Sequence, residues 1–445
     1  MSVDVQAIIP RLAERLGEAR LRPMRGTVRS IRGVLLRASV AGVRIGELCQ
    51  LRDPSSGRSL AAEVIGFEQD EAILSPIGSM EGLSTRTEIL ATGETLGVSV
   101  GDAQLGRVIS PMGDYLDGNG ILPLGVVVRY PLHAEPPPPF SRQLIVRPMS
   151  LGVRSIDGLL TLAQGQRMGI FGEPGVGKSS LLASIVRHTD ADVIVIGLIG
   201  ERSREVADFL ETKVAGAARQ RAVVVAVPAN HSPVLRIRGA LRATAIAEAF
   251  RGEGKKVLLI MDSLTRVAHA GREIGLALGE PASARGYPPS AIAMLPNLIE
   301  RAGTDVRSGG SITAIYTVLA DGDDGNDPVV DSARSILDGH IVLNRHLAER
   351  GVYPAIDIGP SVSRVMTDIA DRPHLAAARV LRRHLATYEE NRDLVLMGAY
   401  RPGTDAAIDG ALAAHPAVME YVKQDSDEVV SLDDAVAELV GVFGG

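Results

Sequence analysis

A glycine-rich stretch at residues 172–179 (GEPGVGKS) constrains the fold of this 445-residue chain more than any other feature. It fills every fixed position of the phosphate-binding pattern G-x-x-x-x-G-K-[ST]. An apolar run that can form a strand precedes it at 166–171, and a helical run follows it at 180–188. Because the pattern needs a strand before it and a helix start after it, the context predicts a P-loop in an α/β domain. A glycine-rich turn without a ligand is the alternative.

Each part of this loop has a physical role in holding a nucleotide. Glycines let the backbone approach phosphates closely, and free N–H groups at the start of a helix favour an anion. Lys178 is expected to reach the β- and γ-phosphates, and the hydroxyl of Ser179 is expected to ligate Mg²⁺. The expected nucleotide-binding residues are Gly172, Glu173, Pro174, Gly175, Val176, Gly177, Lys178, Ser179 and Ser180.

Composition limits the class of protein. With 445 residues, 45% of them hydrophobic, the chain is globular and long enough for two or three domains. Its single cysteine, Cys49, excludes an internal disulfide and favours a small core residue in a reducing, cytoplasmic compartment. A net charge of −6 and 3% aromatic residues argue against a nucleic-acid surface. The sequence lacks an apolar run that would span a bilayer and a signal-peptide layout, so any membrane association is expected to be peripheral.

The pattern of apolar residues changes along the chain. Residues 4–20 predict an amphipathic helix, which either packs on its own domain or docks a partner. Short β runs and turn signals from 26 to 91 predict a small barrel or sandwich. From 144 to 366, apolar strands alternate with helical stretches, which is typical of a parallel sheet covered on both faces. The pattern is helical again from about 373.

Two acids follow predicted strands of the α/β region. Asp262 ends the apolar run 257–262 and matches a Walker B acid, which lies near Mg²⁺. Glu201 directly follows the strand 192–199, at the sheet edge where an open α/β sheet holds its ligand. Hydrolysis of a nucleotide needs a group that polarises the attacking water, and Glu201 is the best candidate for it. The alternative is a charged loop whose acids and arginines pair in solvent.

Several motifs, in order, resemble the ATPases of type III protein export. They are GEPGVGKSSLL, GERSREV, VLLIMDSLTRVAHAGREIGLALGEP, RGYPPS, RSILDGHIVLNR, GVYPAID and SVSRVM, and with LGRVISPMGDYLDG they cover most of the chain. The close relatives are the virulence-secretion and flagellar export ATPases, and the rotary ATP synthase subunits are more distant. The resemblance implies a RecA-like P-loop core with a parallel sheet, preceded by a small N-terminal β-barrel and followed by a C-terminal helical domain. The expected divisions are a docking helix at 1–25, the barrel at 26–93, the ATPase domain at 94–368 and the helical domain at 369–445.

The resemblance also implies a role for residues at matching positions. Tyr353 would pack on the adenine, although the residues alone favour a core tyrosine, and Arg301 would contact phosphate. Arg364, which spacing alone does not separate from a surface arginine, would reach the nucleotide of the adjacent subunit. The catalytic set would be Lys178, Glu201, Arg202 and Arg364, and the metal set would be Ser179, Glu205 and Asp262.

Glu201 and Arg364 occur here in one chain, whereas in rotary synthases their counterparts belong to different subunits. We therefore expect a homohexamer in which every interface is competent for ATP hydrolysis with Mg²⁺. The acidic DELSEED-type segment of catalytic rotary subunits is absent after 398. The expected partners are a stator-like regulator, a central stalk, the export gate and chaperone–effector complexes, with no nucleic acid.

The resulting interpretation is a cytoplasmic, peripheral-membrane Mg²⁺-ATPase at the inner-membrane base of a secretion apparatus. It would couple hydrolysis to chaperone release and to unfolding of exported proteins in virulence. A flagellar export ATPase has the same chemistry in a different machine. A rotary synthase subunit or a Rho-like RNA translocase is a weaker alternative, and a non-enzymatic interaction protein is the weakest.

Overall fold

The structure is a computed structural model that describes residues 24–95, 97–118, 128–214, 216–320 and 327–444. The predicted helix at 4–20 lies outside the described residues. The chain divides into two compact units, residues 1–97 and 98–445. The predicted boundary at 368/369 falls inside the second unit and stays a prediction.

The first unit contains a closed barrel, as the β runs predicted. Its strands are β1 (Arg25–Arg32), β2 (Leu35–Ser39), β3 (Glu47–Arg52), β4 (Ser59–Glu68), β5 (Glu71–Pro76) and β6 (Glu88–Thr95), joined in the order β1-β2-β5-β4-β3-β6. Alternate side chains of these strands fill the barrel, and Cys49 is among them at 1% exposure. The prediction of a small core residue is therefore confirmed, and burial raises the pKa of its thiol to about 12.

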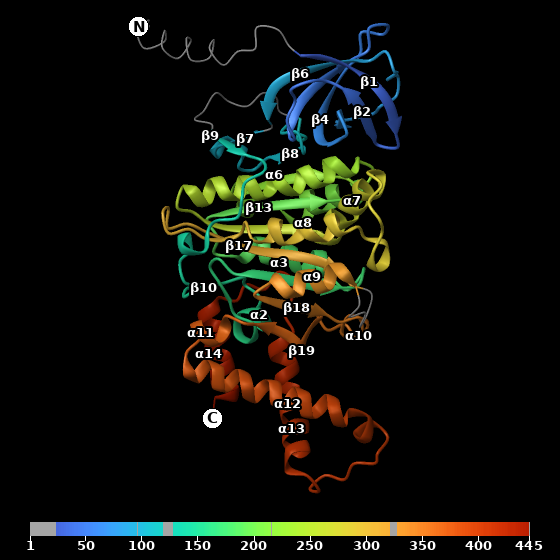
Figure 1. Cartoon of the computed structure of the whole chain (residues 1–445). Helices are drawn as coiled ribbons and strands as arrows, with labels where there is room; N and C mark the ends of the chain where they lie inside the picture. The colour runs from blue at the N-terminus through green and yellow to red at the C-terminus, as the bar shows by residue number, and fades with distance from the viewer. Residues whose placement is uncertain (1–23, 96, 119–127, 215, 321–326, 445) are drawn as a thin grey trace, which may run out of the picture. The chain divides into compact units, whose positions relative to one another are not determined.

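The second unit is built on a nine-stranded sheet (Figure 1). Its order is β19-β18-β12-β17-β15-β13-β14-β8, with β16 paired to β17. All neighbours are parallel except β18/β19 and β16/β17. The strands are β8 (Val108–Ile109), β12 (Arg167–Gly172), β13 (Val193–Ile199), β14 (Ala222–Val227), β15 (Lys256–Asp262), β16 (Gly303–Thr304), β17 (Ser311–Leu319), β18 (Gly339–Leu343) and β19 (Ile356–Ser363).

Helices cover both faces of this sheet, so its central strands are buried along their length, as the apolar runs predicted. On one face α6 contacts β13, β14 and β15, α7 packs on α6, and α8 packs on α7 (Figure 1). On the other face α3 shares a core with alternate residues of the strands. The helices are α2 (Arg154–Leu159), α3 (Lys178–His188), α4 (Ser203–Asp208), α5 (Gly216–Gln220), α6 (Pro233–Gly252), α7 (Leu264–Ala277), α8 (Pro289–Ile299), α9 (Pro328–Ile336) and α10 (Arg345–Glu349).

The C-terminal part is helical, as predicted. It consists of α11 (Met366–Ile369), α12 (Arg372–Leu396), α13 (Ala406–Val422) and α14 (Leu432–Phe443). The long helix α12 packs on α13 and α14 and also contacts α2 and β19. The other described elements are the paired strands β7 (Gly97–Val100) and β9 (Val128–Pro131), the paired strands β10 (Pro148–Met149) and β11 (Leu162–Ala163), a π-helical turn at Phe209–Lys213, and 3-10 turns at Asp102–Gln104, Pro139–Ser141 and Ala284–Gly286. No helix among the described residues is both long and apolar enough to cross a bilayer.

Charged side chains tie the amino ends of the parallel strands together. Arg167, at the start of β12, forms ion pairs with Glu300 and, at 3.0 Å, with Asp338. Arg301 is next to Glu300 and is 2% exposed. Its guanidinium binds Glu248 of α6 through hydrogen bonds of 2.9 and 2.5 Å. This edge is therefore held by a continuous set of buried and half-buried ions.

This placement corrects the expectation for Arg301. The P-loop follows the carboxyl end of β12, whereas Arg301 lies with Arg167 and Glu300 at the amino end. Its third hydrogen bond, of 2.9 Å, goes to the carbonyl of Leu132, so the guanidinium is engaged in the core. The structure does not bring Arg301 to the P-loop of its own chain, and the expected phosphate contact is not retained.

The Arg301–Glu248 pair generates a stability prediction. Arg301→Met would leave Glu248 charged and unpaired in the core, which costs about 3–5 kcal/mol. We expect the thermal midpoint to fall by about 5 °C or more in a scanning calorimeter. The double variant Arg301→Met/Glu248→Leu should recover most of the loss, because no isolated charge remains buried. A single variant as stable as the parent would contradict this account.

Candidate nucleotide-binding site

The P-loop joins the carboxyl end of β12 to the first turn of α3. Gly175 and Gly177 have φ angles of 87° and 90°, which side chains other than glycine rarely adopt. Gly177 is the N-cap of the 11-residue helix α3 and provides no side chain to bind its first N–H groups. Those groups and the helix dipole are thus available to a phosphate.

Some of the other predicted loop residues hold the loop to the rest of the protein, and the others are exposed. Val176 is 2% exposed and packs in the core below the loop. Glu173 forms an ion pair of 3.4 Å with Arg345 of α10. Pro174, Ser179 and Ser180 are exposed. The loop is therefore anchored by its apolar side while its tip and the first turn of α3 face outward.

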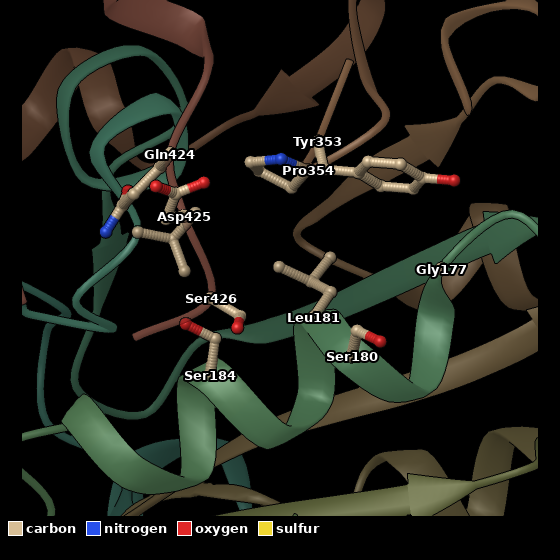
Figure 2. A pocket seen from close by; sticks show the side chains of 10 residues that line it. Gly177, Ser180, Leu181, Ser184, Tyr353, Pro354, Gln424, Asp425 and Ser426 are labelled. Atoms are coloured by element: carbon tan, nitrogen blue, oxygen red, sulfur yellow. The ribbon is translucent and has the colours of Figure 1, made fainter. Parts of the chain in front are cut away.

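Tyr353 lies directly against the P-loop. A Cβ built on Gly177 would lie 3.2 Å from its ring, so glycine is also needed here for close approach. Figure 2 shows the ring extending over the first turn of α3, beside a cavity of about 310 Å³. Tyr353 is 47% exposed rather than a core tyrosine. A planar group in the cavity could therefore stack on the ring of Tyr353 at one end of the cavity.

The opposite wall of this cavity comes from the link between α13 and α14 and was missed by the sequence analysis. It includes Gln424, Asp425 and Ser426, with Ser426 facing Ser184 of α3 in Figure 2. Gln424 is 8% exposed, and its backbone N–H donates to the carbonyl of Tyr353 at 3.0 Å. The C-terminal helices are therefore bonded to the loop that carries the tyrosine.

The side-chain amide of Gln424 fixes this wall to the start of α2. Its Nε2 donates to the carbonyl of Gly152 at 2.9 Å, and its Oε1 accepts from the N–H of Arg154 at 2.7 Å. A glutamine far from any motif carries no sequence signal for such a role.

Lys178 and Asp262 form the polar centre of the site. The Lys178 Nζ lies 2.6 Å from Asp262 Oδ1, and the side chain of Asp262 is 6% exposed. The buried hydroxyl of Thr317, on the neighbouring strand β17, donates to the same oxygen at 2.6 Å. The lysine and the acid that ends β15 thus lie in contact, and Thr317, which carries no motif, fixes the acid.

Glu201 lies at the end of β13, beside Asp262. Together with Ser179 and Glu205, these acids line a cavity of about 70 Å³. Burial, and then the negative charge of Asp262, raise the pKa of Glu201 to about 7. The positive charges of Lys178 and Arg266 act against this rise. A carboxyl with a pKa near neutrality is suited to exchange protons or polarise water at working pH.

Two arginines lie near Glu201. Arg202 is 80% exposed and forms an ion pair of 3.3 Å with Glu205, so its guanidinium is accessible to a ligand. Arg266, on the first turn of α7, packs against Gly200. A Cβ added to Gly200 would lie 2.9 Å from the Cβ of Arg266. Arg266 belongs to the motif VLLIMDSLTRVAHAGREIGLALGEP, but the sequence analysis did not single it out. The sequence does place Arg266 four residues after Asp262, the acid that ends β15, and this spacing could have marked it as a site residue.

The donor set fits Mg²⁺ rather than a metal held by protein ligands alone. Asp262, Ser179 and Glu205 offer hard oxygen atoms around the small cavity. Among the described residues, no three His, Cys, Asp or Glu side chains are grouped so as to hold a metal by themselves. Mg²⁺ usually takes one or two carboxylates and completes its shell with water and phosphate oxygens.

Arg364 lies away from all of these residues. It follows β19, which runs antiparallel to β18, and its N–H donates to the carbonyl of Asp338 at 3.0 Å. Asp338 binds Arg167 at the amino end of β12, whereas the P-loop follows the carboxyl end. At about 3.3 Å per residue, the length of β12 separates the two by about 20 Å. Arg364 is exposed at that edge.

Comparison with known proteins assigns each part of this architecture to one superfamily. Residues 152–363 match the nucleotide-binding domain of the ATP synthase alpha/beta family, and 28–93 match the beta-barrel domain of the same family. Residues 370–441 match the T3SS EscN ATPase C-terminal domain. In its C-terminal helical part, the chain therefore matches the secretion ATPases rather than the rotary subunits.

Individual relatives cover nearly the whole chain. The Type 3 secretion system ATPase of Xanthomonas euvesicatoria is 46% identical over 94% of this chain and 93% of its own length. The Flagellum-specific ATP synthase of Bacillus subtilis is 43% identical over 94% of this chain and 95% of its own. The solved structure of the assembled ATPase EscN from the enteropathogenic E. coli type III secretion system superposes with a TM-score of 0.88 at 42% identity, covering 94% of this chain and 100% of that one. The fold, the P-loop site and these similarities lead to one conclusion: the chain belongs to the type III secretion ATPases of the ATP synthase alpha/beta family.

Proposed function

We propose that this chain is the ATP-hydrolysing motor of a type III secretion apparatus and that Mg²⁺ accompanies its nucleotide. The observation that carries this proposal is that Lys178, Asp262 and Glu201 gather at the carboxyl edge of the parallel sheet. The phosphates would lie along the N–H groups of α3, and the base would enter the cavity beside Tyr353. Ser179, Asp262 and Glu205 would hold Mg²⁺, which neutralises charge on the phosphates.

In the chain alone, Lys178 is paired with Asp262. Phosphates compete for this lysine, so nucleotide binding would draw Lys178 toward the β- and γ-phosphates and release an oxygen of Asp262. Thr317 keeps that carboxylate fixed while its partner changes. Glu201, once ionised, accepts a hydrogen bond from the attacking water and directs it at the γ-phosphate. Arg202 is close enough to Glu205 to reach the same phosphate region.

Arg364 completes the site of a neighbouring copy rather than its own. Its position at the opposite end of β12, about 20 Å away by strand rise, argues against a contact with the P-loop of the same chain. A head-to-tail ring places one edge of each subunit against the opposite edge of the next. We therefore propose a homohexamer in which the Arg364 guanidinium stabilises the charge that develops on the γ-phosphate held next door. The relative EscN is itself described as an assembled ATPase.

The proposed partners follow from the relatives and from one exposed surface. EscN has been solved in complex with its central stalk EscO. Here the end of α12 exposes Leu394, Leu396 and Met397, at 45%, 70% and 73%. We propose this apolar tip as the contact for a central stalk. A stator-like regulator, the export gate and chaperone–effector complexes are further proposed partners, with the ring in the cytoplasm at the inner-membrane base of the apparatus.

Flagellar export remains a second candidate because flagellum-specific relatives are 43–45% identical to this chain. Purification of the chain from its own cells, with identification of the bound proteins, separates the two machines. Injectisome components would support the virulence assignment, and flagellar components would overturn it.

The raised pKa of Glu201 predicts the pH dependence of hydrolysis. Because the carboxylate must be ionised to accept a hydrogen bond from water, kcat/KM for ATP should rise between about pH 6 and about pH 8 and level off above. Glu201→Gln should lower kcat by about 10²–10⁴-fold with ATP still bound. Arg266→Gln removes a charge that favours ionisation, so its profile should shift to higher pH. A parent profile that is flat through pH 7 would contradict the assigned role.

The shared site predicts complementation between two inactive chains. Glu201→Gln and Arg364→Ala should each lose at least about 10³-fold in kcat. In random mixed rings, about a quarter of interfaces join an intact Glu201 to an intact Arg364, so equal mixing should restore up to about a quarter of parental activity. If mixed rings form and no activity returns, the two residues do not share a site.

A further inference from the structure

A half-buried arginine of α12 binds β19, the strand that immediately precedes Arg364. The guanidinium of Arg382 donates from Nη1 to the carbonyls of Ile358 and Ser361, at 2.8 and 3.4 Å. Its Nη2 donates to the carbonyl of Leu159 at 2.9 Å. Burial lowers the pKa of Arg382. One side chain thus joins the long C-terminal helix to β19 and to the end of α2.

The carbonyls that Arg382 binds lie where the sheet cannot bind them. The β18/β19 ladder pairs Val362 with His340 and then resumes at Asp357 with Val342. The intervening residues of β19 form a bulge, and a bulge leaves main-chain groups without ladder partners. Leu159 is the last residue of α2, whose final carbonyls also lack partners within the helix. Arg382 supplies donors to both, so its removal would weaken the hold on the bulge, which the bond from the Val342 N–H to the Ser361 hydroxyl would then share with fewer partners.

This bulge immediately precedes Arg364. Ser361, one of the bonded residues, is three positions before it. Ser363 is anchored separately, because its hydroxyl donates to the carbonyl of Thr161 at 2.9 Å and accepts from Gln166. Arg364 itself is held through its N–H by Asp338. The backbone that carries the exposed arginine is therefore fixed by the core on one side and by α12 on the other.

We propose that Arg382 is a positioning residue that keeps Arg364 aligned with the nucleotide of the neighbouring subunit. Through Arg382, the position of α12 also affects this alignment. A displacement of α12 would move the guanidinium of Arg382 and, with it, the bulge that precedes Arg364. The exposed tip at Leu394–Met397 is at the end of the same helix. A partner that binds this tip and displaces α12 would therefore change the position of Arg364 at the nucleotide of the next subunit. This inference rests on the shared site proposed above and concerns its regulation.

The test is made with the full-length chain and ATP, using Arg382→Gln. Loss of the charged fork should lower kcat about tenfold and leave KM for ATP within about twofold, because the nucleotide pocket of the same chain is intact. Arg382→Lys, which keeps one charged donor, should recover part of the activity. Arg383→Gln, which changes the adjacent exposed arginine of α12, is the matched control and should behave as the parent.

Mixing separates positioning from a purely structural role. When Arg382→Gln chains are mixed equally with Glu201→Gln chains, the second chain supplies a well-held Arg364 to the intact Glu201 of the first. Activity should rise to about a quarter of the parent, against the roughly twentieth expected from dilution alone. No rise overturns the inference if the Glu201→Gln and Arg364→Ala mixture does recover. No recovery in that control mixture, with rings formed, refutes the shared site itself. A higher KM with unchanged kcat would also overturn the proposal.

Discussion

The direction of the parallel sheet is the constraint on which the rest of this structure depends. Parallel strands present all their carboxyl ends at one edge, and that edge collects the P-loop, Glu201 and Asp262. The antiparallel strand β19 returns to the other edge and leaves Arg364 there. In the shared site proposed above, one chain would supply two halves at opposite edges, and a head-to-tail arrangement of copies would bring unlike halves together. The proposal of a ring rests on strand direction rather than on any single contact.

Charged side chains determine the properties of both edges of the sheet. At the carboxyl edge, the lysine of the P-loop neutralises Asp262 at 2.6 Å, while burial and the same aspartate raise the pKa of Glu201. At the amino edge, ion pairs and the buried Arg301–Glu248 pair hold the frame around Arg364. The C-terminal helices bond to both regions, through Gln424 beside the cavity at Tyr353 and through Arg382 beside β19. Under the proposed shared site, movement of these helices would affect the chain's own site and that of its neighbour.

Motifs and strand pattern predicted much of this arrangement. The P-loop, the acid that ends β15 and the acid after β13 were identified because each is tied to a strand end by sequence. The barrel and the helical C-terminal part followed from periodicity. Tyr353 needed the family resemblance, since only the fold brings residue 353 against Gly177. Thr317, Gln424 and Arg382 act through contacts between segments far apart in sequence, which no local pattern encodes. Arg301 was misplaced because its motif says nothing about which edge of the sheet it occupies.

The central claim is that each hydrolytic site is built from the two opposite edges of adjacent copies. Its most direct test is the structure of the assembled ring with Mg²⁺, ADP and a planar phosphate mimic bound. The account predicts the Arg364 guanidinium of one subunit within about 3 Å of the mimic held by Lys178 of the next, with Glu201 of that second subunit facing the attacking water. An Arg364 that contacts no phosphate, or one that reaches the nucleotide of its own subunit, would contradict it.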